Sequence, residues 1–135
     1  MEIKINVETA AEDVKRWLDF KNVRPSKRQA NASYVNELVE SVMYGDITIG
    51  DDCKITQTLK APMLAPDGST VLDKIVYKPR VMVKEMSACL TGNSNNDMEA
   101  TIAMGAAISG QPLAYMARLD SCDFAVVTAI VVFFT

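Results

Sequence analysis

The sequence predicts an α+β fold, with an N-terminal helical hairpin, central antiparallel β-hairpins and a C-terminal helical bundle. Residues 9–44 carry apolar side chains at helical spacing, in two stretches joined by a short connector. Residues 47–77 alternate between apolar and polar side chains and contain two turn sequences. Residues 81–134 return to helical spacing, so helices are expected at both ends of the chain.

The first expected elements are a short strand and a helix. Residues 2–7 alternate apolar and polar side chains, which predicts the strand. Thr9 and Glu12 have the spacing of a capping box, so the helix is expected to begin there. Pro25 disfavours helical geometry at the residue before it, so this helix should end near Lys21.

A second, longer helix is expected after the connector. Ser26 and Gln29 repeat the capping-box spacing, and the helical pattern continues to about Tyr44. Gly45 follows where a C-terminal cap belongs, because glycine tolerates a positive φ. The apolar stripe of this helix consists of Tyr34, Val35, Leu38, Val39, Val42 and Met43. Two amphipathic helices joined by a short turn are typical of a helical hairpin.

The middle of the chain predicts two β-hairpins. Strands at 47–49 and 55–59 flank a turn at 50–52. A second turn at 65–68 contains Pro and Gly, which supply the dihedral angles that a tight turn needs. The return strand is expected at 70–77, because the Lys-Pro sequence that follows cannot continue a hydrogen-bonded ladder.

The last third predicts several helices. Residues 81–90 and 98–108 have helical spacing, and the loop composition of 91–96 separates them. Gly110 closes the second of these helices, and Pro112 opens a short third one. The small residues before Gly110 indicate close helix packing.

The final segment, residues 124–134, is apolar on all faces apart from Thr128. Asp120 as N-cap and Asp123 in the first turn favour a helix. A helix that is apolar all round is either a central core helix or one that keeps a face open for a partner or a second copy. In the second case, the expected partner-binding residues are Phe124, Val127, Ile130, Val131 and Phe134.

The composition is that of one globular domain. The chain has 135 residues, of which 49% are hydrophobic and 23% charged, with a net charge of −3. We expect a single domain over residues 1–135; an alternative division separates 1–45 from 46–135. The negative charge disfavours nucleic acid as a general partner, since such binding needs excess Lys and Arg.

Catalytic and metal-binding residues are scarce. The chain has no histidine, which excludes Ser-His and Cys-His nucleophiles and His-based metal sites. Cys53, Cys89 and Cys122 are far apart and lack CxxC spacing. Asp51, Asp52 and Asp67 are assigned to turns. We therefore expect a protein that is not an enzyme, with no catalytic site, cofactor or metal.

The location expected from the sequence is a reducing cytoplasm. The N-terminus has no signal-peptide pattern, and the longest apolar run is shorter than the about 20 residues that a membrane helix needs. Three unpaired thiols suit a reducing compartment. We expect a soluble protein without a membrane partner.

Two surface patterns bear on partners. Lys21, Arg24, Lys27 and Arg28 form a basic connector, which is either a solvated turn or a contact for an acidic partner. The stretch from Glu85 onward has five acidic residues and one Arg, so a neighbouring copy could supply that acidic surface. Met82, Met86, Met98, Met104 and Met116 are expected as core fillers or as an adaptable binding surface.

Residues 57–134 resemble the small tail assembly chaperones of long-tailed bacteriophages, of the Mu-like type. The resemblance is a layout of strands, loop and helices with scattered matching residues. It runs through residues 58–62, 70–72, 75–80, the Thr-Gly-Asn-Ser loop at 91–94, residues 113–120 and the closing apolar helix. The helical hairpin of residues 9–44 lies outside it.

The resemblance implies a non-enzymatic viral protein that acts in the host cell cytoplasm. Such a chaperone binds the phage tape-measure protein, helps recruit tail-tube proteins and is absent from the finished virion. A long helical tape-measure protein with apolar stripes needs a partner with adaptable apolar surface. The alternatives are a structural virion protein, such as a minor capsid or tail subunit, and a small regulatory nucleic-acid-binding protein.

Overall fold

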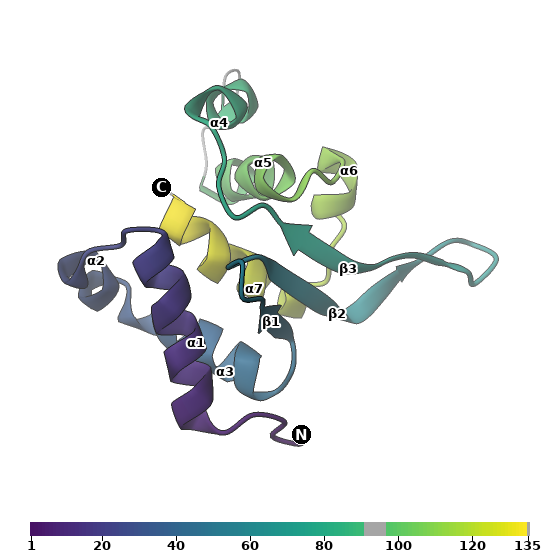
Figure 1. The fold of residues 1–135 in the computed structure, drawn as a ribbon. Coiled ribbons are helices and arrows are strands. Elements are labelled where there is room, and N and C mark those ends of the chain that lie inside the picture. The colour runs from purple at the N-terminus through teal and green to yellow at the C-terminus, as the bar shows by residue number, and fades with distance from the viewer. Residues whose placement is uncertain (91–96, 135) are drawn as a thin grey trace.

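The computed structural model describes residues 1–90 and 97–134, and for residues 87–90 it describes the backbone alone. The fold is mixed α+β, as the sequence predicts, with two groups of helices around a three-stranded antiparallel sheet (Figure 1). The described elements are α1 (Val7–Phe20), α2 (Pro25–Ala30), α3 (Ala32–Met43), β1 (Ile47–Ile49), β2 (Ile55–Leu64), β3 (Thr70–Tyr77), α4 (Val83–Leu90), α5 (Asp97–Ser109), α6 (Leu113–Met116), α7 (Ser121–Val131) and the 3₁₀ turn η1 (Val132–Phe134). The predicted loop at 91–96 lies outside the described residues.

The strand predicted at residues 2–7 does not form. The amides of Lys4 and Ile5 instead donate to the carbonyl of Met43, at 2.8 and 3.2 Å. The last carbonyls of a helix have no partner within it, so this segment satisfies the end of α3 rather than a sheet. Period-two spacing alone predicted a strand, but spacing does not supply a neighbouring strand to pair with.

The first two helix starts are set by other residues than expected. Asn6 caps α1, because its side-chain oxygen accepts from the Thr9 amide at 2.8 Å, so the predicted capping box of Thr9 with Glu12 is wrong. α2 begins with Pro25 at its first position and Arg24 as N-cap, and no side chain caps it. The Ser26 capping box is therefore also wrong, since proline's fixed φ already suits a helix start.

The single helix predicted over residues 26–44 is two helices, α2 and α3. Asn31 leaves helical geometry (φ −117°, ψ 35°), and its side-chain amide donates to the Lys27 carbonyl at 2.9 Å. α3 buries Leu38 and Val42 and ends as predicted at Gly45, whose φ is +80°. The amides of Gly45 and Asp46 donate to the carbonyls of Val42 and Ser41, which is a Schellman motif.

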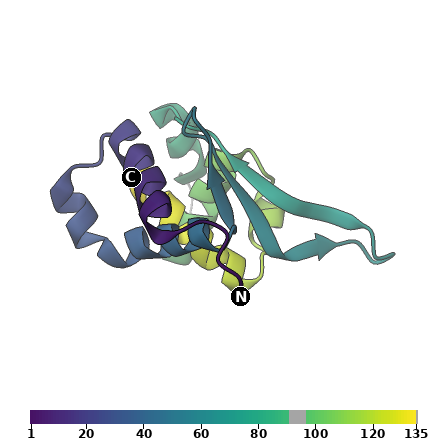
Figure 2. The same ribbon diagram turned by 60° about the horizontal axis from the view of Figure 1, so that its bottom comes forward.

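The two predicted β-hairpins are confirmed, and they share the strand β2. The sheet order is β1-β2-β3, with Ile49 opposite Ile55 and Ile55 opposite Tyr77. β2 is longer than predicted and runs to Leu64, so the second hairpin extends as an arm beyond the body (Figure 2). The pairing of β2 with β3 shifts register between Thr58 and Met63.

The core forms where α7 lies between the sheet and the N-terminal helices (Figure 1). α7 packs against α3, α5 and β2. The ring of Trp17, from α1, packs edge-on against Phe133, with centroids 6.1 Å apart. Buried side chains from the helical hairpin, the sheet and α7 belong to one cluster. The helical hairpin thus packs on the rest of the chain, because its apolar stripe needs a cover.

Candidate protein-interaction surface

The face of α7 that was predicted to bind a partner lies mostly in the core. Val127 and Ile130 are 0% exposed and Val131 is 5% exposed. Phe124 and Phe134 are half-buried. The structure thus corrects the interpretation of an open face: α7 is the central core helix, because most of its residues are buried and the exposed ones, Ser121, Cys122 and Ala125, lie in its first half. Asp120 caps it as predicted, accepting from the Cys122 amide at 3.0 Å.

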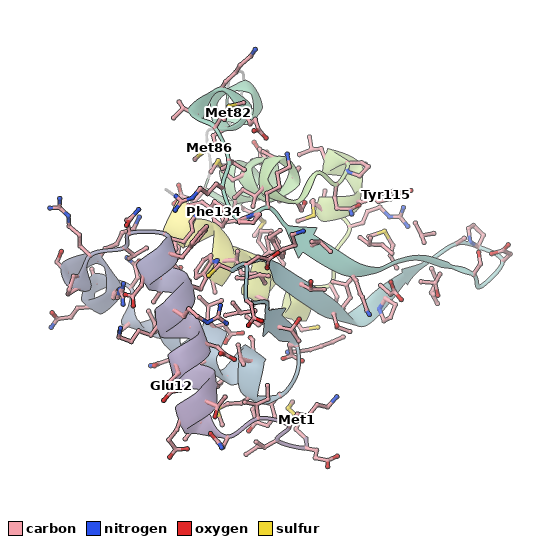
Figure 3. The ribbon with its side chains drawn as sticks, viewed as in Figure 1. Met1, Glu12, Met82, Met86, Tyr115 and Phe134 are labelled. Carbon is pink, nitrogen blue, oxygen red and sulfur yellow. The ribbon has the colours of Figure 1, made fainter. Side chains whose placement is uncertain are left out.

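Four of the exposed large apolar side chains belong to the α4–α6 region; the others lie at the N-terminus and on the β-hairpin. Val83 is 80%, Met82 64%, Met98 63% and Leu113 57% exposed. We call these four residues the apolar flank. Figure 3 shows Met82 at the start of α4, which α5 separates from the sheet. These four residues belong to, or directly precede, helices that contact one another, α4 with α5 and α5 with α6. Exposed apolar groups on neighbouring elements mark interaction sites more often than single scattered ones do.

The methionines divide between the two expected roles. Met104 and Met116 are 3% and 1% exposed and fill the core. Met82 and Met98 belong to the apolar flank, and Met86 is half-buried. Methionine has a flexible, polarizable side chain, so exposed methionines suit a surface that must adapt to its partner.

The start of α4 is held in a way that presents the flank. The Glu85 carboxylate reaches back to the Met82 amide, which donates to it at 3.4 Å, and it also pairs with the Lys78 ammonium at 2.9 Å. The hydrogen bond from Lys78 is the main reason why the pKa of Glu85 lies below its usual range. These two contacts hold Glu85 at the start of α4, where the neighbouring side chains of Met82 and Val83 are exposed to solvent.

Two of the clefts beside α5 are lined in part by residues of the apolar flank. The larger, of about 500 Å³, is bounded by Glu85 and Leu113 and has small side chains as its floor: Ala103, Ala106, Ala107 and Gly110. The smaller, of about 180 Å³, is lined mainly by Met98, Ile102, Met116, Leu119 and Phe124. Both clefts are largely apolar, and each includes one residue of the apolar flank. An apolar helix face or chain segment could seat its side chains in them.

The flank is joined to the core at Gly105, as the small-residue pattern predicted. A Cβ at this position would lie 3.0 Å from Met116 Cε and 3.1 Å from Val127 Cγ1. The absence of a side chain therefore lets α5 approach α7 closely. The carbonyl of Gly105 also accepts from the Ser109 hydroxyl at 2.6 Å. That hydrogen bond lies within α5, whereas the close approach of Gly105 to Val127 brings α5, which carries Met98, against the core helix α7.

A buried polar network connects α7 to the sheet. The Tyr77 hydroxyl donates to Gln57 Oε1 at 2.6 Å, and Gln57 Nε2 donates to the Asp123 carbonyl at 3.0 Å. The Asp123 carboxylate accepts from the amides of Lys60 and Ala61, at 2.8 and 3.0 Å. These two amides lie where the pairing of β2 with β3 changes register. The network thus satisfies backbone groups that the sheet leaves over.

This network does not provide an active site. Gln57 is 0% exposed, and Tyr77 and Asp123 are each 1% exposed. Burial raises the pKa of the Tyr77 hydroxyl far above its usual value, and the Asp123 charge adds to this. The hydroxyl therefore remains a hydrogen-bond donor. A substrate has no access to these groups, so their role is to hold the first turn of α7 on β2.

The sequence analysis did not identify this network. Asp123 was interpreted as a helix-dipole residue, and Gln57 as an ordinary strand residue. A signal was present, because Asp123 is the charged residue of a helix that is otherwise apolar. A buried charge needs hydrogen-bond partners, and the sequence could not show that β2 supplies them.

Neither described cysteine side chain is suited to nucleophilic attack. Cys53 is 5% exposed, and the Arg16 guanidinium donates to its sulfur at 3.5 Å. Cys122 is exposed, but its hydrogen bond with Asp120, desolvation and the negative charges of Asp123 and Asp120 raise the pKa of its thiol. A raised pKa disfavours the reactive thiolate. The side chain of Cys89 lies outside the described residues.

The acidic residues of the turns have the roles expected of them. Asp52 accepts from the Lys54 amide at 3.0 Å. Asp67 accepts from the amide and the hydroxyl of Ser69, at 2.9 and 2.6 Å, and these bonds lower the pKa of its carboxyl. Among the described side chains, those of residues 1–86 and 97–134, no three His, Cys, Asp or Glu gather closely enough to hold a metal ion. No helix in these ranges is long and apolar enough to cross a membrane.

Comparison with known proteins adds no further constraint. No protein-family model, curated protein or solved structure matches this chain. The resemblance to phage tail assembly chaperones therefore depends on the sequence layout alone.

Proposed function

We propose that this chain is a non-enzymatic phage tail assembly chaperone, which binds the tape-measure protein and helps recruit tail-tube subunits in the host cell cytoplasm. The proposal combines the resemblance of residues 57–134 with one structural observation: the apolar flank. The binding surface is assigned to Met82, Val83, Met98 and Leu113 instead of the predicted face of α7. Phe124 keeps a role, because it lines the smaller cleft with Met98.

The chemistry of the flank supports a helical partner. An amphipathic helix binds by laying its apolar stripe along an apolar surface with pockets for its side chains. The flank offers two such pockets beside α5, one with an alanine floor and one lined by methionine and aromatic side chains. Contacts with methionine adapt to different side chains along a repetitive partner.

The first experiment is a pull-down from infected cells with the tagged chain, followed by mass spectrometry of the eluate and of purified virions. The chaperone proposal expects a long helical tail protein in the eluate and this chain missing from virions. Finding this chain in virions at fixed stoichiometry would contradict it and favour a structural subunit. Salt-sensitive recovery of DNA instead of protein would favour the regulatory alternative.

A pair of variants links the binding to the flank. Val83→Lys with Leu113→Lys places charges among the exposed apolar side chains and should abolish recovery of the tail protein. Leu64→Lys with Val76→Lys is the matched control, because these residues are 53% and 44% exposed on the β-hairpin. The control should bind as the unchanged chain does. Equal loss in both double variants would show that the flank is not the binding surface.

A further inference from the structure

Charges around the N-terminal helices are sorted to the two ends of α1. The acidic end consists of Glu2, Glu8, Glu12 and Glu40, all of them exposed. The basic end consists of Lys21, Arg24, Lys27 and Arg80. α1 has 14 residues and is about 21 Å long, at about 1.5 Å per residue. Glu12, the acidic residue nearest to the basic end, is about 14 Å from Lys21 along the helix.

The positions of the two ends follow from contacts. Met43 accepts from the amides of Lys4 and Ile5, so the last turn of α3, with Glu40, lies beside the start of α1. Lys4 also lies there, with its side chain against Gly45. At the other end, the Lys21 ammonium lies over the ring of Phe134, 3.4 Å from its centroid. Figure 3 shows Glu12 on the lower half of α1 and Phe134 beyond its upper end.

Neither end is neutralised within the chain. The ion pairs of the described residues join Lys15 and Arg28 to Asp19, Arg16 to Asp13, Lys60 to Asp46, and Lys78 to Glu85. None of the eight residues of the two ends takes part in an ion pair with another described residue. Of the predicted basic connector, only Arg28 is paired with a carboxylate.

The cations of the basic end are held by groups without a negative charge. Lys21 Nζ donates to the Pro79 carbonyl at 3.3 Å. Arg80 donates to the Phe20 carbonyl at 2.9 Å and lies over the Phe20 ring at 4.2 Å. Burial, together with the charges of Arg80 and Lys27, lowers the pKa of Lys21 to about 8. These cations therefore repel one another, and a carboxylate from outside would relieve the repulsion.

Helix dipoles explain only part of this sorting. They favour Glu8 at the start of α1 and Lys21 at its end. They do not favour Glu40, which lies near the C-terminus of α3, where negative charge is disfavoured. Arg80 comes from the segment after β3, so its place beside α1 is a consequence of tertiary packing.

We propose that the basic end of one copy of this chain binds the acidic end of a second copy. The two groups of charges lie around opposite ends of α1 and cannot meet within the chain, whereas opposite charges on two copies can. The acidic stretch from Glu85 onward is less suitable, because three of its five carboxylates are engaged within the chain: Glu85 pairs with Lys78, Asp123 is buried, and Asp120 caps α7. The net charge of −3 disfavours nucleic acid as the occupant.

Sedimentation velocity over a range of protein concentrations tests this proposal. At about 0.01 M salt the Debye length is about 30 Å, and at about 1 M it is about 3 Å. The average sedimentation coefficient should therefore rise with protein concentration at low salt and stay constant at high salt. A monomer at every concentration in low salt would overturn the proposal, as would association that strengthens with salt.

Charge reversal locates the contact. Arg24→Glu with Lys27→Glu reverses the basic end, and Glu8→Lys with Glu12→Lys reverses the acidic end. The association affinity of each double variant alone should fall by at least roughly tenfold, because like charges then face each other. An equimolar mixture of the two should associate again, because each reversed end now finds an opposite charge. A mixture that stays monomeric overturns the proposal.

A matched control separates the contact from net charge. Lys54→Glu with Lys74→Glu changes the net charge as much as the basic-end variant does, on exposed positions of the sheet region. It should associate like the unchanged chain, and association lost to the same extent in this control would contradict an assignment to the ends of α1. Thermal unfolding confirms that each variant is folded, since Glu8, Glu12 and Arg24 are exposed.

Discussion

The sheet with α7 and the apolar flank are opposite kinds of structure within one chain. In the sheet and α7, buried polar groups are matched: no buried side-chain nitrogen or oxygen of the described residues lacks a hydrogen-bond partner. In the flank, Val83 and Leu113 leave more than half of their surface in solvent. Folding alone explains the first region, since it buries apolar groups and pairs polar ones. It does not explain the second, and this difference is why we assign binding to the flank.

Loss of the Asp123 carboxylate is the change expected to have the largest effect on this comparison. Asp123→Ala leaves the amides of Lys60 and Ala61 without their acceptor at a largely buried site. We expect the free energy of unfolding to fall by about 2 to 3 kcal/mol, because unsatisfied donors keep their desolvation cost. Urea denaturation followed by circular dichroism measures this loss.

Asp120→Ala is the control for that variant. It removes an exposed N-cap of the same helix, which should cost about 1 kcal/mol. If the two variants lose equal stability, the buried network contributes no more than an ordinary cap. The distinction between a fully matched region and the flank would then lose its main support.

Gly105, where the flank meets the core, should show an intermediate effect. Gly105→Ala gains about 1 kcal/mol of helix propensity but loses about 1 to 3 kcal/mol through overpacking against Val127 and Met116. We expect a net loss of about 1 kcal/mol, since both neighbours are buried and Val127 is stiff at χ1.

Thermal unfolding measures the Gly105 effect, and the same substitution in a Met116→Ala background is its control. Removing the Met116 side chain opens space for the new Cβ, so the added alanine should then be neutral or stabilising. A stabilising Gly105→Ala in the unchanged background would show that α5 is free to move away from α7. The contact between α5 and α7 would then be less tightly packed than the distances around Gly105 indicate.

Lys21, at the C-terminal end of α1, should have a smaller effect on stability, and this effect should depend on pH. Its pKa is lowered from 10.5 to about 8 in the folded chain, mainly by burial. Between these values the unfolded chain binds a proton that the folded chain lacks, so the contribution of Lys21 to stability rises with pH. Relative to Lys21→Gln, the unchanged chain should therefore be more stable at about pH 10 than at about pH 7.

Urea midpoints at the two pH values measure that difference. Lys54→Gln, which removes a cation at an exposed position, is the control for the loss of one positive charge. A stability of the unchanged chain relative to Lys21→Gln that stays constant or falls as pH rises would contradict the desolvation of the Lys21 ammonium at the end of α1.

Substitution in the flank should have the smallest effect on stability. Val83→Lys and Leu113→Lys are each expected to change the free energy of unfolding by no more than about 0.5 kcal/mol, as surface substitutions do. A loss above about 2 kcal/mol would mean that these side chains are core residues in solution, and it would undo the comparison. Combined with lost partner binding, unchanged stability would assign the flank to function.

Local chemistry predicted much of the fold. The turn at 65–68, the Asp120 cap and the glycine end of α3 were all predicted, because each depends on a few neighbouring residues. The strand at 2–7 and both capping boxes were wrong. Those patterns were present, but Asn6, Pro25 and the end of α3 offered better partners for the same backbone groups.

The candidate binding surface was harder to predict. Apolar character identified α7 as unusual, and the sequence left its two interpretations open. Exposure decided between them, and exposure depends on which elements cover α7. The same lack of information concealed the flank. Met98 and Met104 are the same residue type on one helix, α5, yet Met98 is 63% exposed and Met104 is 3% exposed.

The sequence by itself determined the order and type of most elements, the turns, the α+β class and the lack of histidine chemistry. These follow from residue type and from contacts a few positions apart. Only the tertiary structure decided that α7 is the core helix, that Asp123 satisfies the irregular part of β2, and that the flank remains open. Each of these depends on residues far apart in the chain, and burial is a property of the packed chain as a whole.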